Sequence, residues 1–171
     1  MTVKVDIVGI VWKKPNSLGK KINRRHMLSV ELVPKTAWEI NIRSEVSKSE
    51  WDRLRKYVYK KADYCCEVCG GKGANHPVEA HEIWEYDDKK HIQTLIGLIA
   101  LCTRCHRVKH IGLAQVQGKY DQARKHLALI NGWTIEEAEK YIRKQFDLWE
   151  KRSKFTWTID YSWIENNIPN S

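Results

Sequence analysis

Alternating hydrophobic and polar residues in the first part of the chain predict two β-strands. One run covers residues 3–12 and is rich in valine and isoleucine, and the other covers residues 28–33 and ends at Pro34. The basic segment between them contains proline, asparagine and glycine, which are typical of a loop. We therefore expect an N-terminal hairpin with a long basic loop.

The pattern then changes to helical spacing. Ser47 and Glu50 form the S-x-x-E signature of a capping box, which predicts a helix from there to about residue 62 with one apolar face. Residues 114–130 keep helical spacing with an interruption at Gly118. After a break at residues 131–132, a second capping box, Thr134 to Glu137, opens a helix to about residue 151. Residues 156–161 have the composition of a short final strand.

The middle of the chain combines both patterns. Residues 78–84 alternate with a period of two, which predicts a strand with Glu79 and His81 on the same side. A polar loop at 87–90 and a short apolar strand at 98–101 follow. Residues 103–110 then predict a helix that ends at Gly112.

This middle region also contains the residues with the clearest chemistry. Two C-x-x-C pairs are typical of a tetrahedral zinc site, because each pair brings two thiolates to one ion from a tight turn. The four predicted ligands are Cys66, Cys69, Cys102 and Cys105. The fifth cysteine, Cys65, is interpreted as a spare buried thiol.

Histidines lie beside the second cysteine pair. His106 and His110 are four residues apart on the predicted helix, so that both imidazoles can reach one ion. His81 lies on the preceding strand. Strand, loop, strand and helix with histidines on the first strand and the helix form a ββα metal unit.

The chain is expected to be an α+β protein of three parts. An N-terminal β element and helix occupy residues 1–63, a zinc-containing ββα core occupies residues 64–112, and a helical C-terminal cap occupies residues 113–171. No apolar stretch approaches the roughly 20 residues of a membrane span, and no signal peptide is apparent. We therefore expect a cytoplasmic protein with reduced cysteines and no membrane partner.

Charge adds a candidate partner. The net charge is +9, and residues 1–63 contain fifteen Lys and Arg against seven Asp and Glu. A basic segment next to a metal site favours nucleic acid, since Lys and Arg neutralise phosphates and release counterions. The candidate contacts are the six cations of the predicted loop and its continuation: Lys13, Lys14, Lys20, Lys21, Arg24 and Arg25.

Residues 66–110 resemble the HNH nucleases, whose ββα-metal finger is held together by zinc. The resemblance rests on L-C-x-x-C-H-x-x-x-H at 101–110, on C-x-x-C at 66–69 and on E-A-H at 79–81, and it covers roughly a quarter of the chain. It implies a general base on the strand that activates water. It also implies a divalent metal (Mg²⁺, Mn²⁺, Ni²⁺ or Zn²⁺) held by the helix histidines, which stabilises the leaving 3′ oxygen.

Two departures from the family pattern leave alternatives open. The family's strand has a metal ligand followed by a base, and here the pair is either Ala80-His81 or His81-Glu82. In the first register His81 is the base. In the second, His81, His106 and His110 bind the metal and Glu82 is the base. Gly97 also stands where the family has an asparagine that orients the base, and Gln93 is a candidate substitute.

The expected function is therefore metal-dependent hydrolysis of phosphodiester bonds in nucleic acid, with double-stranded DNA as the expected substrate. The catalytic residues are then His81, Glu82 and His106. The alternative from another class is a catalytically inactive, zinc-dependent module that only binds nucleic acid. Haem attachment through C-x-x-C-H at residues 102–106 is disfavoured, because it needs an exported context and leaves the first cysteine pair unexplained.

Overall fold

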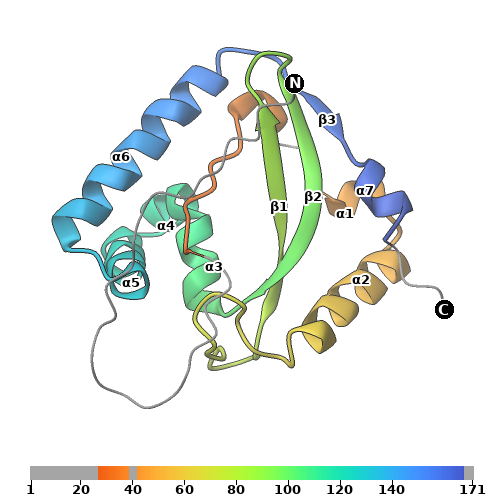
Figure 1. Ribbon diagram of the computed structural model, residues 1–171, viewed down its shortest axis with the longest axis horizontal. Coiled ribbons are helices and arrows are strands. Elements are labelled where there is room, and N and C mark those ends of the chain that lie inside the picture. Colours follow the sequence, from red (N-terminus) through yellow and green to blue (C-terminus); the bar gives the residue numbers. More distant parts are fainter. Residues whose placement is uncertain (1–26, 39–41, 168–171) are drawn as a thin grey trace, which may run out of the picture.

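The computed structural model describes residues 27–38 and 42–167, and within them a long antiparallel hairpin divides the helices into two groups (Figure 1). Its strands are β1 (Glu79–Asp87) and β2 (Ile92–Leu101), and β3 (Thr158–Asp160) pairs in parallel with the start of β2. The result is an α+β fold with a small three-stranded sheet in the order β1-β2-β3.

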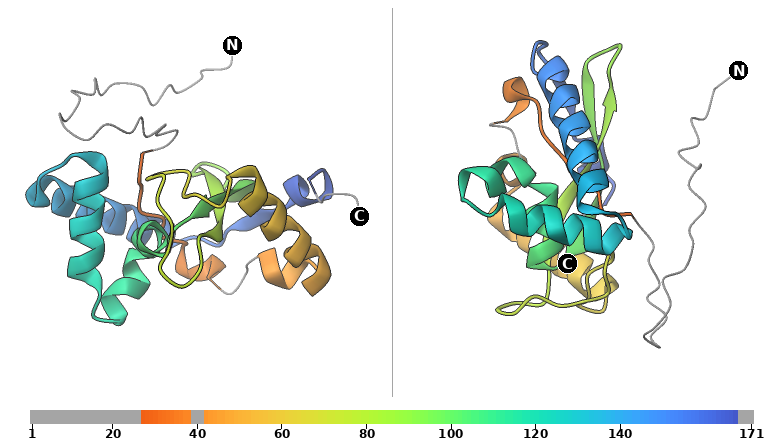
Figure 2. Two further views of the ribbon diagram at one scale, coloured as in Figure 1. Left: turned by 90° about the horizontal axis from the view of Figure 1, so that it is seen from below. Right: turned by 90° about the vertical axis from the view of Figure 1, so that its left-hand side faces the viewer.

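One helical group lies beside the hairpin and contains α1 (Ile42–Glu45), α2 (Lys48–Lys61) and α7 (Ser162–Glu165). The other group contains α3 (Thr103–Lys109), α4 (Ile111–Val116), α5 (Tyr120–Asn131) and α6 (Ile135–Arg152). Figure 2 shows the two groups at opposite ends of the molecule. A short 3₁₀ turn, η1 (Lys35–Ala37), follows the first described segment.

Both predicted capping boxes are present. The Ser47 hydroxyl accepts a hydrogen bond from the Glu50 backbone N–H, and the Glu50 carboxylate accepts one from the Ser47 N–H in return. Thr134 and Glu137 make the same pair of contacts at the start of α6. The helix boundaries predicted from these signatures are therefore confirmed, because the cap satisfies N–H groups that have no partner inside the helix.

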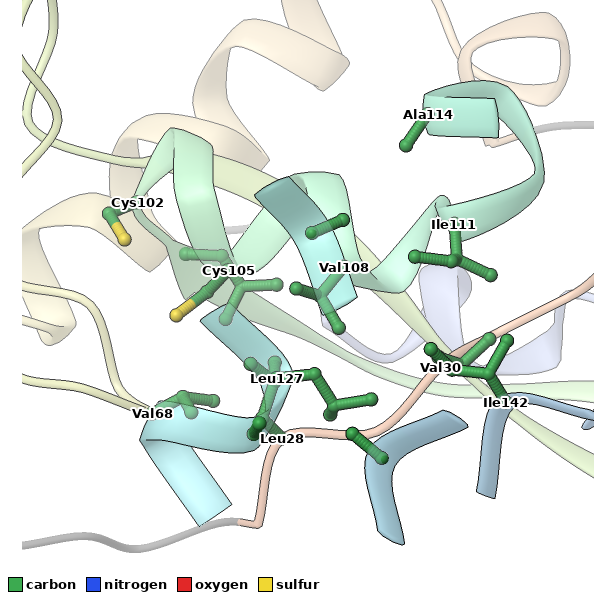
Figure 3. Packing of buried hydrophobic residues seen from close by; sticks show 14 of the residues in the cluster. Leu28, Val30, Val68, Cys102, Cys105, Val108, Ile111, Ala114, Leu127 and Ile142 are labelled. Atoms are coloured by element: carbon green, nitrogen blue, oxygen red, sulfur yellow. The ribbon is translucent and has the colours of Figure 1, made fainter. Parts of the chain in front are cut away.

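The largest buried cluster joins all three parts of the chain. Figure 3 shows Cys105 and Val108 of α3 close to Leu127 of α5, with Leu28 of the first segment alongside. Ile142 of α6 belongs to the same cluster. α3, which carries His106, is thus packed against α5 and residues 28–30. The position of α3 is therefore fixed by this burial as well as by its two cysteines.

Residues 28–33 are extended but form no strand, which makes this prediction wrong. Their backbone groups bond to side chains and to a helix end instead: Leu28 N–H donates to Asn131 Oδ1 at 3.1 Å and Glu31 N–H to the Lys109 carbonyl at 2.9 Å. The predicted partner strand at 3–12 and the six cations of residues 13–25 lie outside the described residues. Figure 1 shows residues 28–33 running beside α3 and α4.

The predicted helix stop at Gly112 is also wrong. α3 ends at Lys109, His110 has a non-helical backbone (φ −96°, ψ 49°), and Gly112 lies inside α4. The interruption at Gly118 is real: its φ of +67° separates α4 from α5, and Gly132 ends α5 with a φ of +69°. The second strand begins at residue 92, well before the predicted 98.

Candidate metal centres

The four cysteines of the two C-x-x-C pairs come together as predicted. Their sulfur atoms all lie within 4.8 Å of one another, and Cys69 Sγ is 3.6 Å from Cys102 Sγ. A tetrahedral ion with Zn–S bonds of about 2.3 Å places its sulfurs about 3.8 Å apart, which agrees with this spacing. The arrangement can hold a structural metal such as zinc.

Each pair is formed by local structure. Cys66 and Cys69 lie in a tight turn in which Gly70 N–H donates to the Cys66 carbonyl at 2.7 Å, and Gly70 takes a φ of +73°. Cys102 is the N-cap residue of α3 and Cys105 lies in its first turn. The first pair is tied to β2, because Glu67 N–H donates to the Ala100 carbonyl at 2.9 Å.

The thiols need a cation to be stable together as thiolates. Hydrogen bonding from Cys105 lowers the pKa of Cys102, and the same contact raises the pKa of Cys105. The four groups therefore compete for protons, and a divalent ion removes the competition by binding all of them as thiolates. His126 of α5 lies beside the group, with Nε2 at 3.3 Å from Cys105 Sγ.

A second cluster contains the three predicted histidines. One ring nitrogen from each of His81, His106 and His110 lies within 4.8 Å of the other two, and the Nε2 atoms of His106 and His110 are 3.1 Å apart. The ring centroids are between 4.7 and 5.1 Å apart. Imidazoles 2.0–2.1 Å from a tetrahedral zinc ion would have their nitrogens about 3.4 Å apart, so the spacing suits one ion.

Neighbouring carboxylates determine which ring nitrogens are free. Glu79 accepts a hydrogen bond from His106 Nδ1, which leaves His106 Nε2 with its lone pair facing the cluster. Glu31 accepts one from His81 Nε2 at 2.8 Å, which leaves Nδ1 of that ring. His81 Nδ1 is buried and has no hydrogen-bond partner among the described residues, as expected of a nitrogen that a metal would take.

Metal binding requires neutral imidazoles, and burial favours the neutral form of His106 and His110. Burial, and then the charges of His81 and His106, lower the pKa of His110 to about 3. Burial and then His81 lower the pKa of His106, against the opposite effect of Glu79. The lone pairs of these two rings are therefore available to a cation.

Glu79 connects the cluster to a further histidine. Its second oxygen accepts a hydrogen bond from His76 Nε2 at 2.5 Å, and the side chain of His76 is half exposed. Burial would raise the pKa of Glu79, but the hydrogen bonds from His76 and His106 outweigh it and lower that pKa. Glu79 therefore remains ionised and able to hold His106 in one tautomer.

Glu82 lies on the other side of β1. Strand alternation places it opposite Glu79 and His81, and it is half-buried. Burial and then the charges of Glu45 and Glu82 raise the pKa of Tyr161 to about 12.

The asparagine that orients the base in the family has no polar counterpart beside the histidines, either at Gly97, which stands at its position, or at Gln93, the candidate substitute. Gly97 is paired with Ile83 inside the hairpin. Gln93 is buried opposite Tyr86, six residues along β2 from Ile99, the cross-strand partner of His81. At about 3.4 Å per residue, this is about 20 Å away, so Gln93 does not orient a base beside His81.

Sequence reasoning missed several contacts of the histidines. The alternation of β1 predicted that Glu79 lies on the same side of the strand as His81. It did not predict the contact between Glu79 and His106. Glu31 and Lys109 carried no such signal, because the contact between Glu31 and His81 spans 50 positions of the chain.

Among the described residues no helix is long and apolar enough to cross a membrane. Comparison of the chain with protein-family models, with curated proteins and with solved structures found no match.

Proposed function

We propose that this protein is a metal-dependent endonuclease of the HNH type, with a ββα-metal core formed by β1, β2 and α3. The observation that carries the proposal is the cluster of His81, His106 and His110. In this cluster, one ring nitrogen of His81 and one of His106 each donate a hydrogen bond to a carboxylate. A purely structural zinc module explains the cysteines but gives no reason for three converging imidazoles with those carboxylates behind them.

The residues that would hold the catalytic metal are His81 through Nδ1 and His106 and His110 through Nε2. When bound, the metal would supply a positive charge that stabilises the phosphate and the leaving 3′ oxygen in the transition state. Three protein ligands leave coordination positions for a phosphate oxygen or water, as in other catalytic sites with three protein ligands.

The position of His81 favours the second register of the family pattern. Its side chain is almost completely buried and its Nε2 is bound to Glu31, so it is better suited to bind a metal than to take a proton from bulk water. Glu82 is then the general base. It takes a proton from water, the resulting hydroxide attacks phosphorus, the P–O3′ bond breaks, and the leaving oxygen gains a proton from solvent.

The cysteine centre would serve the histidine centre. Cys102 caps α3 and Cys105 lies one residue before His106, so a zinc ion bound there fixes the first turn of that helix. A rigid helix keeps His106 and His110 at the distance that one ion requires, and such preorganisation is needed for a catalytic site.

The proposal is tested by incubating the zinc-loaded protein with supercoiled plasmid and Mg²⁺, Mn²⁺ or Ni²⁺. We expect nicked or linear plasmid with at least one of these ions and none after chelation of the added metal. The matched control is His110→Ala, which removes one ligand of the histidine cluster and leaves all four cysteines intact. Plasmid that is bound but never cut with any ion would contradict the proposal and favour the inactive binding module.

We further propose that nucleic-acid affinity comes largely from the basic segment of residues 13–25. Neutralising Lys13, Lys14, Lys20, Lys21, Arg24 and Arg25 together should make the slope of log affinity against log salt shallower by up to about 5, since each phosphate contact on duplex DNA contributes about 0.9. The measurement is a fluorescence anisotropy titration at several salt concentrations.

The control for this prediction neutralises exposed lysines of α6 and its C-terminal end, namely Lys140, Lys144, Lys151 and Lys154. This variant should keep the wild-type slope. If the control flattens the slope and the first variant does not, the binding surface lies on the C-terminal helices instead.

A further inference from the structure

Glu31 reaches the histidine cluster from outside the region that resembles HNH nucleases. Its Oε2 accepts the hydrogen bond from His81 Nε2 at 2.8 Å, and its side chain is only 20% exposed. A carboxylate can only accept in this contact, so the proton lies on Nε2 and the lone pair of His81 lies on Nδ1. The tautomer of this ring is therefore set by a residue 50 positions earlier in the chain.

Lys109 forms an ion pair with this carboxylate and holds it in place. Its Nζ is buried, donates to Ser29 Oγ at 2.8 Å and forms an ion pair with Glu31 Oε1. A buried carboxylate with a cation on one oxygen and an imidazole N–H on the other is fully paired.

The backbone around Glu31 is fixed at several points. Its N–H donates to the Lys109 carbonyl at 2.9 Å, and the neighbouring Val30 N–H donates to Tyr141 Oη at 3.2 Å. Leu28 exchanges two hydrogen bonds with the Asn131 side chain, and Trp149 Nε1 donates to the Val33 carbonyl. Contacts to α3, α5 and α6 thus hold the backbone of the segment, so the side chain of Glu31 starts from a fixed position beside His81.

We propose that Glu31, with Lys109 behind it, is a positioning residue that prepares His81 to bind the metal of the histidine cluster. It holds His81 Nδ1 free of protons, fixes the plane of the ring and makes the ligand more basic, as outer carboxylates do for metal-bound histidines. Glu79 accepts a hydrogen bond from His106 in the same way, so carboxylates set the tautomer of two of the three rings. The inference rests on the proposed metal site and makes residues 28–33 a part of it.

The experiment measures metal affinity rather than cleavage. The zinc-loaded protein is titrated with Ni²⁺, which imidazoles bind well. Glu31→Gln keeps an acceptor for His81 but removes the charge, and it should weaken Ni²⁺ binding by about 10- to 100-fold. Because it leaves Lys109 buried without its counterion, the double variant Glu31→Gln/Lys109→Met is measured beside it. That variant leaves no unpaired charge and should show a similar loss.

The matched control is Glu139→Gln. Glu139 is a carboxylate of similar exposure, 23%, which accepts hydrogen bonds from Tyr120 and Arg124 away from the histidines. This variant should bind Ni²⁺ like the wild type. In addition, ¹⁵N spectra of the metal-free protein should show His81 protonated on Nε2, and the double variant should show a mixture of tautomers, which a role in folding alone would not produce.

Each outcome decides a specific point. Wild-type Ni²⁺ affinity in both Glu31 variants, or an equal loss in Glu139→Gln, would overturn the inference and leave the nuclease proposal intact. Affinity that depends on Glu31 without any plasmid cleavage would support the inference and count against the nuclease. Wild-type protein that takes up no metal beyond its zinc would overturn both.

Discussion

Replacing Cys69 by alanine is expected to release the bound zinc and to abolish the cooperative fold of the region around β1, β2 and α3. Binding of structural zinc by thiolates contributes about 10–16 kcal/mol in small zinc-dependent peptides, which is as large as the whole stability of a typical domain, about 5–15 kcal/mol. The region depends on it because Cys66, Cys102 and Cys105 all belong to the main buried cluster. Elemental analysis and thermal unfolding followed by circular dichroism measure the two effects.

The chain contains its own control for this experiment. Cys65 is adjacent to Cys66 but lies outside the cysteine cluster, and its thiol lies 3.4 Å from the Asp63 carbonyl near the surface. Cys65→Ala should retain one structural zinc and change the free energy of unfolding by no more than about 0.5 kcal/mol. The metal-site interpretation fails if Cys69→Ala is as stable as Cys65→Ala, or if the folded wild-type protein contains no zinc.

The elements that the sequence predicted well are those specified by neighbouring residues. A capping box is complete within four residues, so Ser47 and Thr134 marked the starts of α2 and α6 correctly. C-x-x-C pairs and an i, i+4 histidine pair are equally local. Their convergence on two separate centres required only that β1 and β2 pair and that α3 follow directly after β2.

Elements whose partners lie far away in the chain were predicted less well. Hydrophobic and polar residues alternate over 28–33 as in a strand, but this alternation indicates only that one side of the segment is buried. Here the burying partners are α3, α5 and α6, and Asn131 supplies hydrogen bonds that a neighbouring strand would otherwise supply. Glu31 was missed for the same reason, since nothing near it in the sequence indicates a histidine contact.

The predicted end of the helix after the second cysteine pair failed for a different reason. Glycine commonly ends a helix, but it does so where a left-handed backbone is needed, as at Gly132. At Gly112 a side chain would approach Leu32 at 3.3 Å, so this glycine permits close packing of α4 against the first segment. The turn occurs at His110 instead, which is the residue that completes the histidine cluster.

Replacing any of the three clustered histidines by alanine is expected to abolish cleavage while the protein remains folded, because the cysteine centre is separate. Loss of a general base typically lowers the rate by about 10²–10⁴, and loss of a ligand to a catalytic metal should be at least as severe. His91→Ala is the matched control, since His91 stacks on Phe155 at the opposite end of the hairpin. It should cut plasmid at a rate close to that of the wild type.

Glu82 distinguishes the two registers. If Glu82 is the general base, Glu82→Gln should lower the cleavage rate by about 10²–10⁴ and retain metal affinity, because an amide cannot accept the proton but preserves the shape of the side chain. His81→Ala should then weaken metal binding. Glu85→Gln, an exposed position on the same strand, is the control and should leave both quantities unchanged.

The opposite pattern would identify His81 as the base. His81→Ala would then bind metal as the wild type does, and Glu82→Gln would retain most of its activity. The structure favours the first pattern: His81 Nε2 is already bound to Glu31, and its Nδ1 is buried, so neither nitrogen is free to accept a proton from solvent. If Glu82 is the base, its carboxylate must reach the phosphate from the face of β1 opposite to that of His81. If Glu82→Gln and Glu85→Gln cleave equally fast while His81→Ala keeps its metal, the assignment of Glu82 as the base is wrong.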